Sequence, residues 1–391
     1  MKKRIFLLLI IVLLVPVFDN SNHSVYATSV EEEQFGDVVD EQLSNVDLSD
    51  LQQYLDSLDS TGQQIFGNNS IMDKIQNLLS GEMDADFGSF LSMILNILFG
   101  NITDILPIFC IILAVGILYN LIGSLVLNNN GTKSIVEFVC FGVVVVIVSG
   151  LLFNLLQSTH TVISNIKGQM DALFPILLTL VASVGGAVSV GIFQPMTAIL
   201  SNGIVQIFSI LIMPLFTFCF VFSVVGNISD SVKLDKFQSL FDKIFKWIVR
   251  GVFGIFSALL VLQGLLAGSY DGLSVRATKF AIKNYVPLLG GYLSDGFNLV
   301  AGSSVLIKNC VGVVGLFLLF GTILGPILDV VVFAILMHLS SAILQSLGVA
   351  KMSKFLEQTS KLSSYLLTII IAVGFVYILS IGMLMCIANI V

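Results

Sequence analysis

The chain has 391 residues, of which 56% are apolar and only 11% carry a charge, and its net charge is −7. Soluble domains carry about 25% charged residues, so a chain this apolar must turn much of its surface to lipid or to other membrane helices. Fourteen of its 25 acidic residues lie between Glu31 and Asp86, where Lys74 is the only base, and this acidic balance excludes a nucleic-acid-binding protein.

Residues 1–27 have the pattern of a cleavable signal peptide. Three bases at positions 2–4 precede the apolar stretch Ile5–Phe18, whose 14 residues fall short of a membrane span. The tripeptide that ends in Ala27 suits signal peptidase, so we expect cleavage after Ala27. The alternative is an uncleaved signal anchor.

Residues 28–86 form an acidic segment that would begin outside the cytoplasm. Apolar residues recur at helical spacing from Leu48 to Leu58 and again from Ile71 to Leu79, which predicts two short amphipathic helices. Two interpretations remain open: a docking surface for extracytoplasmic partners, or a loosely ordered solubilising arm.

From Phe87 to Val391 the chain is almost continuously apolar, which predicts an all-α polytopic membrane helix bundle. Residues 87–100 are expected to form an interfacial helix. The expected spans are 104–127, 135–157, 173–193, 197–226, 251–268, 307–347 and 364–390. Because 307–347 is too long for one crossing, we expect it to divide at Gly325-Pro326, which gives about eight crossings.

Two basic segments, 233–250 and 351–362, alternate lysines with apolar residues and are expected to lie in the headgroup plane. They belong to a tandem repeat with copies at about 160–268 and 272–390. Lysine and proline recur 8 residues apart in both copies, at Lys167 and Pro175 and at Lys279 and Pro287. If each copy has an odd number of crossings, the copies are inverted, as in many transporters, and the basic segments lie on opposite sides.

Polar, glycine and proline residues in the second copy are the candidates for a conduit, because broken helices and intramembrane charges need protein or water around them. The candidates are Lys279, Lys283, Pro287, Gly290, Gly291, Asp295, Lys308, Asn309 and Asp329. Some of these charges are expected to pair between helices, for example Asp295 with Lys308. Snorkelling or simple structural pairing is the competing interpretation.

No enzyme signature is present. The chain has no Gly-Lys-Ser/Thr phosphate loop and no Cys-x-x-Cys, and it has only three histidines. Its five cysteines are widely spaced within apolar runs, which indicates buried small hydrophobic residues. We therefore expect no catalytic residue, no metal and no cofactor.

The polar, glycine-rich stretch of the second copy resembles the stage III sporulation protein AE family of endospore-forming Firmicutes. The residues that carry the resemblance are Lys279-Phe-Ala-Ile-Lys-Asn-Tyr-Val-Pro287-Leu-Leu-Gly-Gly-Tyr-Leu-Ser294-Asp295, Ser304-Val-Leu-Ile-Lys308-Asn309 and Val311-Gly-Val-Val-Gly315. The resemblance covers nearly the whole chain but transfers no catalytic residue. It implies a permease-like subunit of an export complex in the mother-cell membrane around the forespore, needed for late forespore development.

The partners that the resemblance implies are the other stage III sporulation A-complex membrane proteins and their traffic-type ATPase, besides the lipid bilayer and a second copy of the chain. Two other functions stay open. A stand-alone secondary transporter of a small molecule would use Asp329 or Asp295, and a membrane scaffold would tolerate neutral substitutions at both and at Lys308.

Overall fold

The computed structural model describes residues 29–387 apart from short segments at 59, 68, 82–86, 126–129, 229–234 and 286–289. The predicted signal peptide and its cleavage site lie outside the described residues. Every regular element in the described part of the chain is a helix, and six helical rods are long and apolar enough to cross a membrane. The prediction of an all-α membrane bundle is therefore confirmed.

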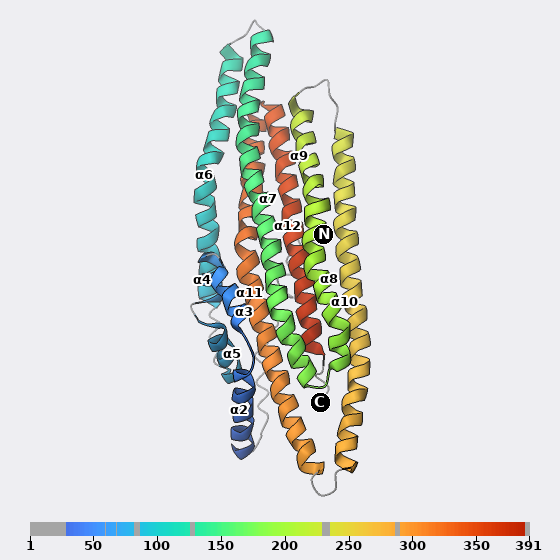
Figure 1. The fold of residues 1–391 in the computed structure, drawn as a ribbon. Coiled ribbons are helices and arrows are strands. Elements are labelled where there is room, and N and C mark those ends of the chain that lie inside the picture. Colours follow the sequence, from blue (N-terminus) through green and yellow to red (C-terminus); the bar gives the residue numbers. More distant parts are fainter. Residues whose placement is uncertain are drawn as a thin grey trace.

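The six rods run antiparallel to their neighbours in the chain (Figure 1). They are α6 (Phe87–Leu125), α7 (Asn130–Ser183), the continuous rod α8 (Ala187–Ile207), η1 (Phe208–Ile212) and α9 (Met213–Ile228), then α10 (Asp235–Tyr285), α11 (Gly290–Ser346) and α12 (Ala350–Cys386). η1 is a single π-helical turn, one residue wider than an α turn. We call the end where α11 turns into α12 the basic end and the opposite end the arm end.

The expected count of about eight crossings is not what the structure has. α11 continues unbroken through Gly325-Pro326. A proline removes one backbone hydrogen bond of an apolar helix, and neighbouring helices and local adjustments of the backbone satisfy the freed group. The expected span 135–157 and the start of 173–193 belong to one helix, α7, and the expected interfacial helix 87–100 is the first part of α6. At 1.5 Å per residue the 54 residues of α7 extend about 80 Å, well beyond a hydrocarbon core of about 30 Å.

The chain reverses instead at Gly185 and Gly348, whose φ angles are 92° and 79°. At the first turn Gly185 N–H donates to the Ala182 carbonyl and Gly186 N–H donates to the Val181 carbonyl. At the second turn Gly348 N–H donates to the Gln345 carbonyl and Val349 N–H donates to the Leu344 carbonyl. Each pair of bonds is the Schellman motif that ends a helix. Glycine is favoured there because a side chain would be strained at positive φ.

α11 and α12 form the centre of the bundle, and half of the residues in the most apolar part of each are buried. Small polar side chains join them: Ser341 and Ser353 hydrogen-bond each other's carbonyl oxygens at 2.8 and 2.9 Å, and Ser360 donates to the Ala334 carbonyl. These hydroxyls are satisfied without water, so the two helices approach closely.

The acidic segment folds into four short helices, which we call the arm: α2 (Ser29–Ser44), α3 (Ser49–Ser57), α4 (Ser60–Phe66) and α5 (Ile71–Ser80). The sequence predicted two. α5 begins with a capping box between Ser70 and Asp73, and the apolar faces of α3 and α5 are buried. The arm is packed on α11 and α7 (Figure 1), unlike the loosely ordered arm that the sequence left open.

The two basic segments lie at the same end of the bundle. α10 and α12 both run from the basic end to the arm end (Figure 1), and Lys246 of the first segment and Lys361 of the second line one pocket. The expectation that inversion would separate these segments is therefore wrong. The tandem repeat itself, with copies at about 160–268 and 272–390, remains a prediction.

Candidate functional site

A polar pocket of about 240 Å³ lies between α6, α7 and α11, inside three candidate membrane spans. It is lined by Asn101 and Asp104 of α6, Asn154 and Ser158 of α7, and Asp329 of α11. We call it the carboxylate pocket. Charge at this depth is costly, so carboxylates and amides gathered there indicate water, a cation or a polar partner rather than lipid.

Helical spacing brings these side chains together. Asn101 and Asp104 are three residues apart and Asn154 and Ser158 four apart, so each pair shares one face of its helix. The side-chain nitrogen of Asn101 is buried and has no hydrogen-bond partner within the described ranges. Asp104 is exposed, so the pocket opens to the side of the bundle.

A stripe of exposed small and polar residues continues from this pocket along α7. We call it the polar stripe: Asn154, Gln157, Thr161, Ser164 and Gly168. The alternating spacing of three and four residues keeps it on one face of the helix. At the end of the stripe nearest the arm, a Cβ atom added to Gly168 would lie 3.9 Å from the Tyr54 ring of α3. The stripe therefore joins the carboxylate pocket to the arm.

The arm packs directly on α11. The Tyr54 hydroxyl lies 2.8 Å from the Thr322 hydroxyl, and a Cβ added to Gly321 would lie 3.0 Å from the Gly62 carbonyl oxygen. Since Thr322 and Asp329 are 7 residues apart on one helix, this contact is about 10 Å from the pocket.

Lys74 strengthens the same contact, because its ammonium lies 5.4 Å from the centre of the Phe66 ring and 5.9 Å from that of Phe317 on α11. Burial lowers the pKa of Lys74 below its ordinary value. The pocket, the polar stripe and the arm together are called the polar flank.

The other side of the bundle is apolar. Large apolar side chains of α8, η1 and α10 are exposed there, among them Ile199, Ile210, Trp247 and Ile255, with exposed fractions from 59% to 77%. In Figure 1 the arm helices α3 and α4 lie at the height of α8 and of the middle of α10. At one level, therefore, the bundle presents acidic helices on one side and an apolar face on the other.

The predicted candidates do not converge on one site. Lys308 is fully buried on α11 and donates to the Ile387 carbonyl at the end of α12, where a cation complements the helix dipole. Asn309 is half-buried, and its side-chain oxygen has no partner among the described residues. Of the nine candidates, Asp329 alone is seen in the carboxylate pocket, and the 21 residues that separate it from Lys308 span about 32 Å.

The remaining candidates belong to the arm-end hairpin of α10 and α11. Lys279 and Lys283 lie on α10, and Gly290, Gly291 and Asp295 begin α11, with only their backbone described; Pro287 is outside the described residues. The proposed pairing of Asp295 with Lys308 is wrong, since 13 residues of one continuous helix place them about 20 Å apart.

Four residues of the carboxylate pocket were missed by sequence reasoning: Asn101, Asp104, Asn154 and Ser158. Asp104 begins the expected span 104–127 and Asn154 lies in the expected span 135–157, whereas Asn101 and Ser158 fall just outside these spans. The available signal was the helical spacing of polar residues on either side of those boundaries. The cysteine prediction was also too broad, since Cys140, Cys219 and Cys310 are buried but Cys110 and Cys386 are exposed.

No cluster of three or more His, Cys, Asp or Glu side chains that could hold a metal ion occurs in the described part of the chain. What the pocket does offer is two carboxylates and two amides, which bind water or a weakly held cation through oxygen ligands.

Comparison with known proteins agrees with the sequence resemblance. The sequence model of the family described as Stage III sporulation protein AE matches residues 69–388. A relative with that name from Bacillus subtilis (strain 168) is 29% identical over 292 residues, which cover 73% of this chain and 70% of the relative. No solved structure matches. The chain is a sporulation-related, multi-pass membrane protein, and it belongs to the stage III sporulation protein AE family.

Proposed function

We propose that this protein is a conduit-forming subunit of an export complex in the mother-cell membrane around the forespore, needed for late forespore development. The observation that carries the proposal is the acidic arm packed over α11 between Val300 and Thr322, inside the candidate span Asn298–Ser346.

The arm cannot face hydrocarbon. Its carboxylates, among them Asp47, Asp50, Asp56 and Asp73, are exposed to the outside of the bundle. An ionised side chain in lipid costs several kcal/mol, whereas the same group in a water-filled passage costs little. The polar flank therefore suits the lining of an aqueous conduit, and the apolar side of α8 to α10 suits lipid or a neighbouring subunit.

A single subunit with one polar flank does not enclose a passage by itself. Several copies, or this chain together with other membrane subunits, would close one with the polar flanks inward. The proposed partners are therefore a second copy of the chain and the other stage III sporulation A-complex membrane proteins.

The charges favour one orientation in the membrane. Lysines and arginine gather at the basic end, at Lys236, Lys243, Lys246, Arg250, Lys351, Lys354 and Lys361. The positive-inside tendency favours the basic end on the cytoplasmic side and the arm end on the other side of the membrane, in agreement with the signal peptide expected from the sequence. The traffic-type ATPase would then approach the basic end. The other basic stretch of α10, Arg276–Lys283, lies at the arm end.

Thiol accessibility tests the proposal. Single cysteines replace Asn154 or Thr161 on the polar stripe, and Ile210 or Ile255 on the apolar side, after Cys110 and Cys386 have been changed to serine. In membranes isolated from sporulating cells and opened to the reagent on both sides, a membrane-impermeant maleimide should label the first pair and spare the second. Protection of the stripe would show that the polar flank does not face water. Equal labelling of both pairs would show that the polar flank is no more accessible than the apolar side, which would also contradict the proposal.

The carboxylate pocket also supports a second function, the stand-alone transporter, because Asp104 and Asp329 could bind a coupling cation. Proteoliposomes that contain only this protein would then take up a solute, and Asp329→Asn would abolish uptake. The conduit subunit should show no uptake alone, while the same variant impairs sporulation. A scaffold should show no uptake, and Asp329→Asn should leave sporulation intact.

A further inference from the structure

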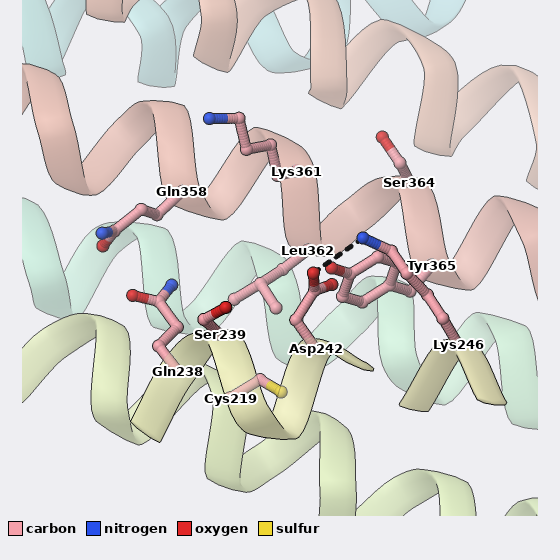
Figure 2. Close-up of a pocket in the computed structure, with 10 residues that line it drawn as sticks. All are labelled: Cys219, Gln238, Ser239, Asp242, Lys246, Gln358, Lys361, Leu362, Ser364 and Tyr365. Carbon is pink, nitrogen blue, oxygen red and sulfur yellow. Dashed lines mark hydrogen bonds and ion pairs between the residues drawn. The ribbon is translucent and has the colours of Figure 1, made fainter. Parts of the chain in front are cut away.

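A second pocket, far from the polar flank, lies near the basic end between α10 and α12 (Figure 2). Its volume is about 550 Å³, within the usual range of small-molecule sites. Cys219 of α9 lies at its inner wall, and the exposed Ser239, Lys361 and Ser364 lie at its mouth. The pocket is therefore open to the outside of the bundle.

The two helices that form the pocket are held together firmly. Phe245 of α10 stacks on Tyr365 of α12 with 4.5 Å between ring centres. Gln358 is fixed from behind, because its side-chain oxygen accepts bonds of 2.7 Å from both Ser223 and Asn227 of α9. The pocket is thus preorganised, which lowers the cost of ordering it around a ligand.

The charged groups of the pocket are of both signs. Lys246 donates to one oxygen of Asp242 at 2.7 Å and lies 5.5 Å from the centre of the Tyr365 ring, while Lys361 donates to Glu357 at 2.6 Å. The other oxygen of Asp242 is buried and has no hydrogen-bond partner among the described residues. A buried carboxylate oxygen of this kind is stabilised by a cationic N–H donor.

Below the pocket the exposed surface of both helices becomes apolar. On α12 the exposed residues change from Lys361, Ser364 and Thr368 to Phe375. On α10 Phe237 and Leu240 are already exposed above the pocket, and Ile255 is exposed below Arg250. Trp247, the single tryptophan of the chain, is exposed beside the pocket, as is typical of the membrane interface. A charged pocket above an apolar surface complements an amphiphile whose head carries charge and whose tails do not.

We propose that this pocket binds the head group of an amine-bearing phospholipid of the cytoplasmic leaflet, its phosphate at Lys361 and Lys246 and its ammonium at Asp242. The ammonium N–H groups supply a donor to the Asp242 carboxylate, whose side chain is 30% exposed and lines the pocket and whose second oxygen has no partner among the described residues. A choline head has no N–H to donate, so the pocket should prefer phosphatidylethanolamine to phosphatidylcholine. This site is separate from the carboxylate pocket; the choice of leaflet rests on the orientation proposed above, but the lipid preference does not depend on the proposed conduit.

The test uses the purified full-length chain in mild detergent, titrated with dioleoyl phosphatidylethanolamine or dioleoyl phosphatidylcholine and followed by native mass spectrometry. One saturable phosphatidylethanolamine molecule should bind about tenfold more tightly than phosphatidylcholine, the difference expected from one charge-assisted hydrogen bond. Asp242→Asn should abolish this preference, and Lys361→Gln should weaken the binding of both lipids.

Lys243→Gln is the matched control, because Lys243 is an exposed lysine of α10 that does not line the pocket. Ser364→Leu, which fills the mouth and keeps every charge, separates lost binding from lost folding. Equal binding of the two lipids would overturn the proposal, as would equal effects of Lys243→Gln and Lys361→Gln. The proposal would also fail if inorganic phosphate bound at the site without displacing bound phospholipid.

Discussion

The contact between Tyr54 and Thr322 should control how firmly the arm stays on α11. The Thr322 hydroxyl already donates its single hydrogen to the Leu318 carbonyl at 2.9 Å, so the Tyr54 hydroxyl is the donor in the 2.8 Å bond between the two side chains. Tyr54→Phe removes that bond and leaves Thr322 satisfied on its own helix. The expected loss is about 0.5–1.5 kcal/mol, which raises the undocked population of the arm about 2- to 13-fold.

Hydrogen exchange of the α3 amides measures this population, because those amides exchange when the arm opens. In lipid nanodiscs Tyr54→Phe should speed their exchange by that factor, and Gln53→Ala, an exposed change on the same helix, should not. The double variant with Thr322→Val should exchange more slowly than the two single effects predict when added. Unchanged exchange in Tyr54→Phe, or strict additivity, would refute the contact.

Three further outcomes are expected. Gly185→Ala should lower the free energy of unfolding by about 1–2 kcal/mol, since alanine is strained at a φ of 92°; an unchanged thermal midpoint would contradict the turn. Lys308→Met should lower the melting temperature, because the Ile387 carbonyl loses a charged donor worth about 1.5–3 kcal/mol, whereas the exposed Lys354→Met should not; a more stable Lys308→Met would refute this role. Cysteines at Lys243 and at Lys354 should be labelled from the same, cytoplasmic side, and labelling from opposite sides would restore the inverted arrangement.

The fold class was accessible from the sequence because apolar length and helical spacing are local properties. The same locality explains why the arm helices around Leu51 and Ile75 were expected. The number of crossings was not accessible in this way. Gly185 and Pro326 both interrupt apolar runs, yet only Gly185 ends a helix, because its turn completes two Schellman bonds while α11 continues through Pro326.

The carboxylate pocket shows a different limit. Asp329 was recognised because it is an isolated charge deep in an apolar run. Asn101, Asp104 and Asn154 come from helices far away in the chain, and only their packing against α11 gives the group its chemistry. The packing of the arm on α11 is likewise a tertiary contact that no periodicity encodes.

The π-helical turn η1 adjusts the phase of the long rod between α7 and α10. Leu200, Ile204, Phe208, Ile212 and Phe216 are buried at a constant interval of four residues. In a regular α-helix those 16 residues would rotate the last side chain about 160° away from the first. The wider turn removes most of that rotation and keeps one continuous face toward the core.

One residue within 208–212 is therefore a spacer, and its removal would leave a regular α-helix with both ends still facing the core. The same deletion in α8 has no turn to absorb it and would rotate Ser223 and Asn227 by about 100° away from Gln358. Deletion of a single residue from this rod should therefore be tolerated at η1 and harmful one turn away.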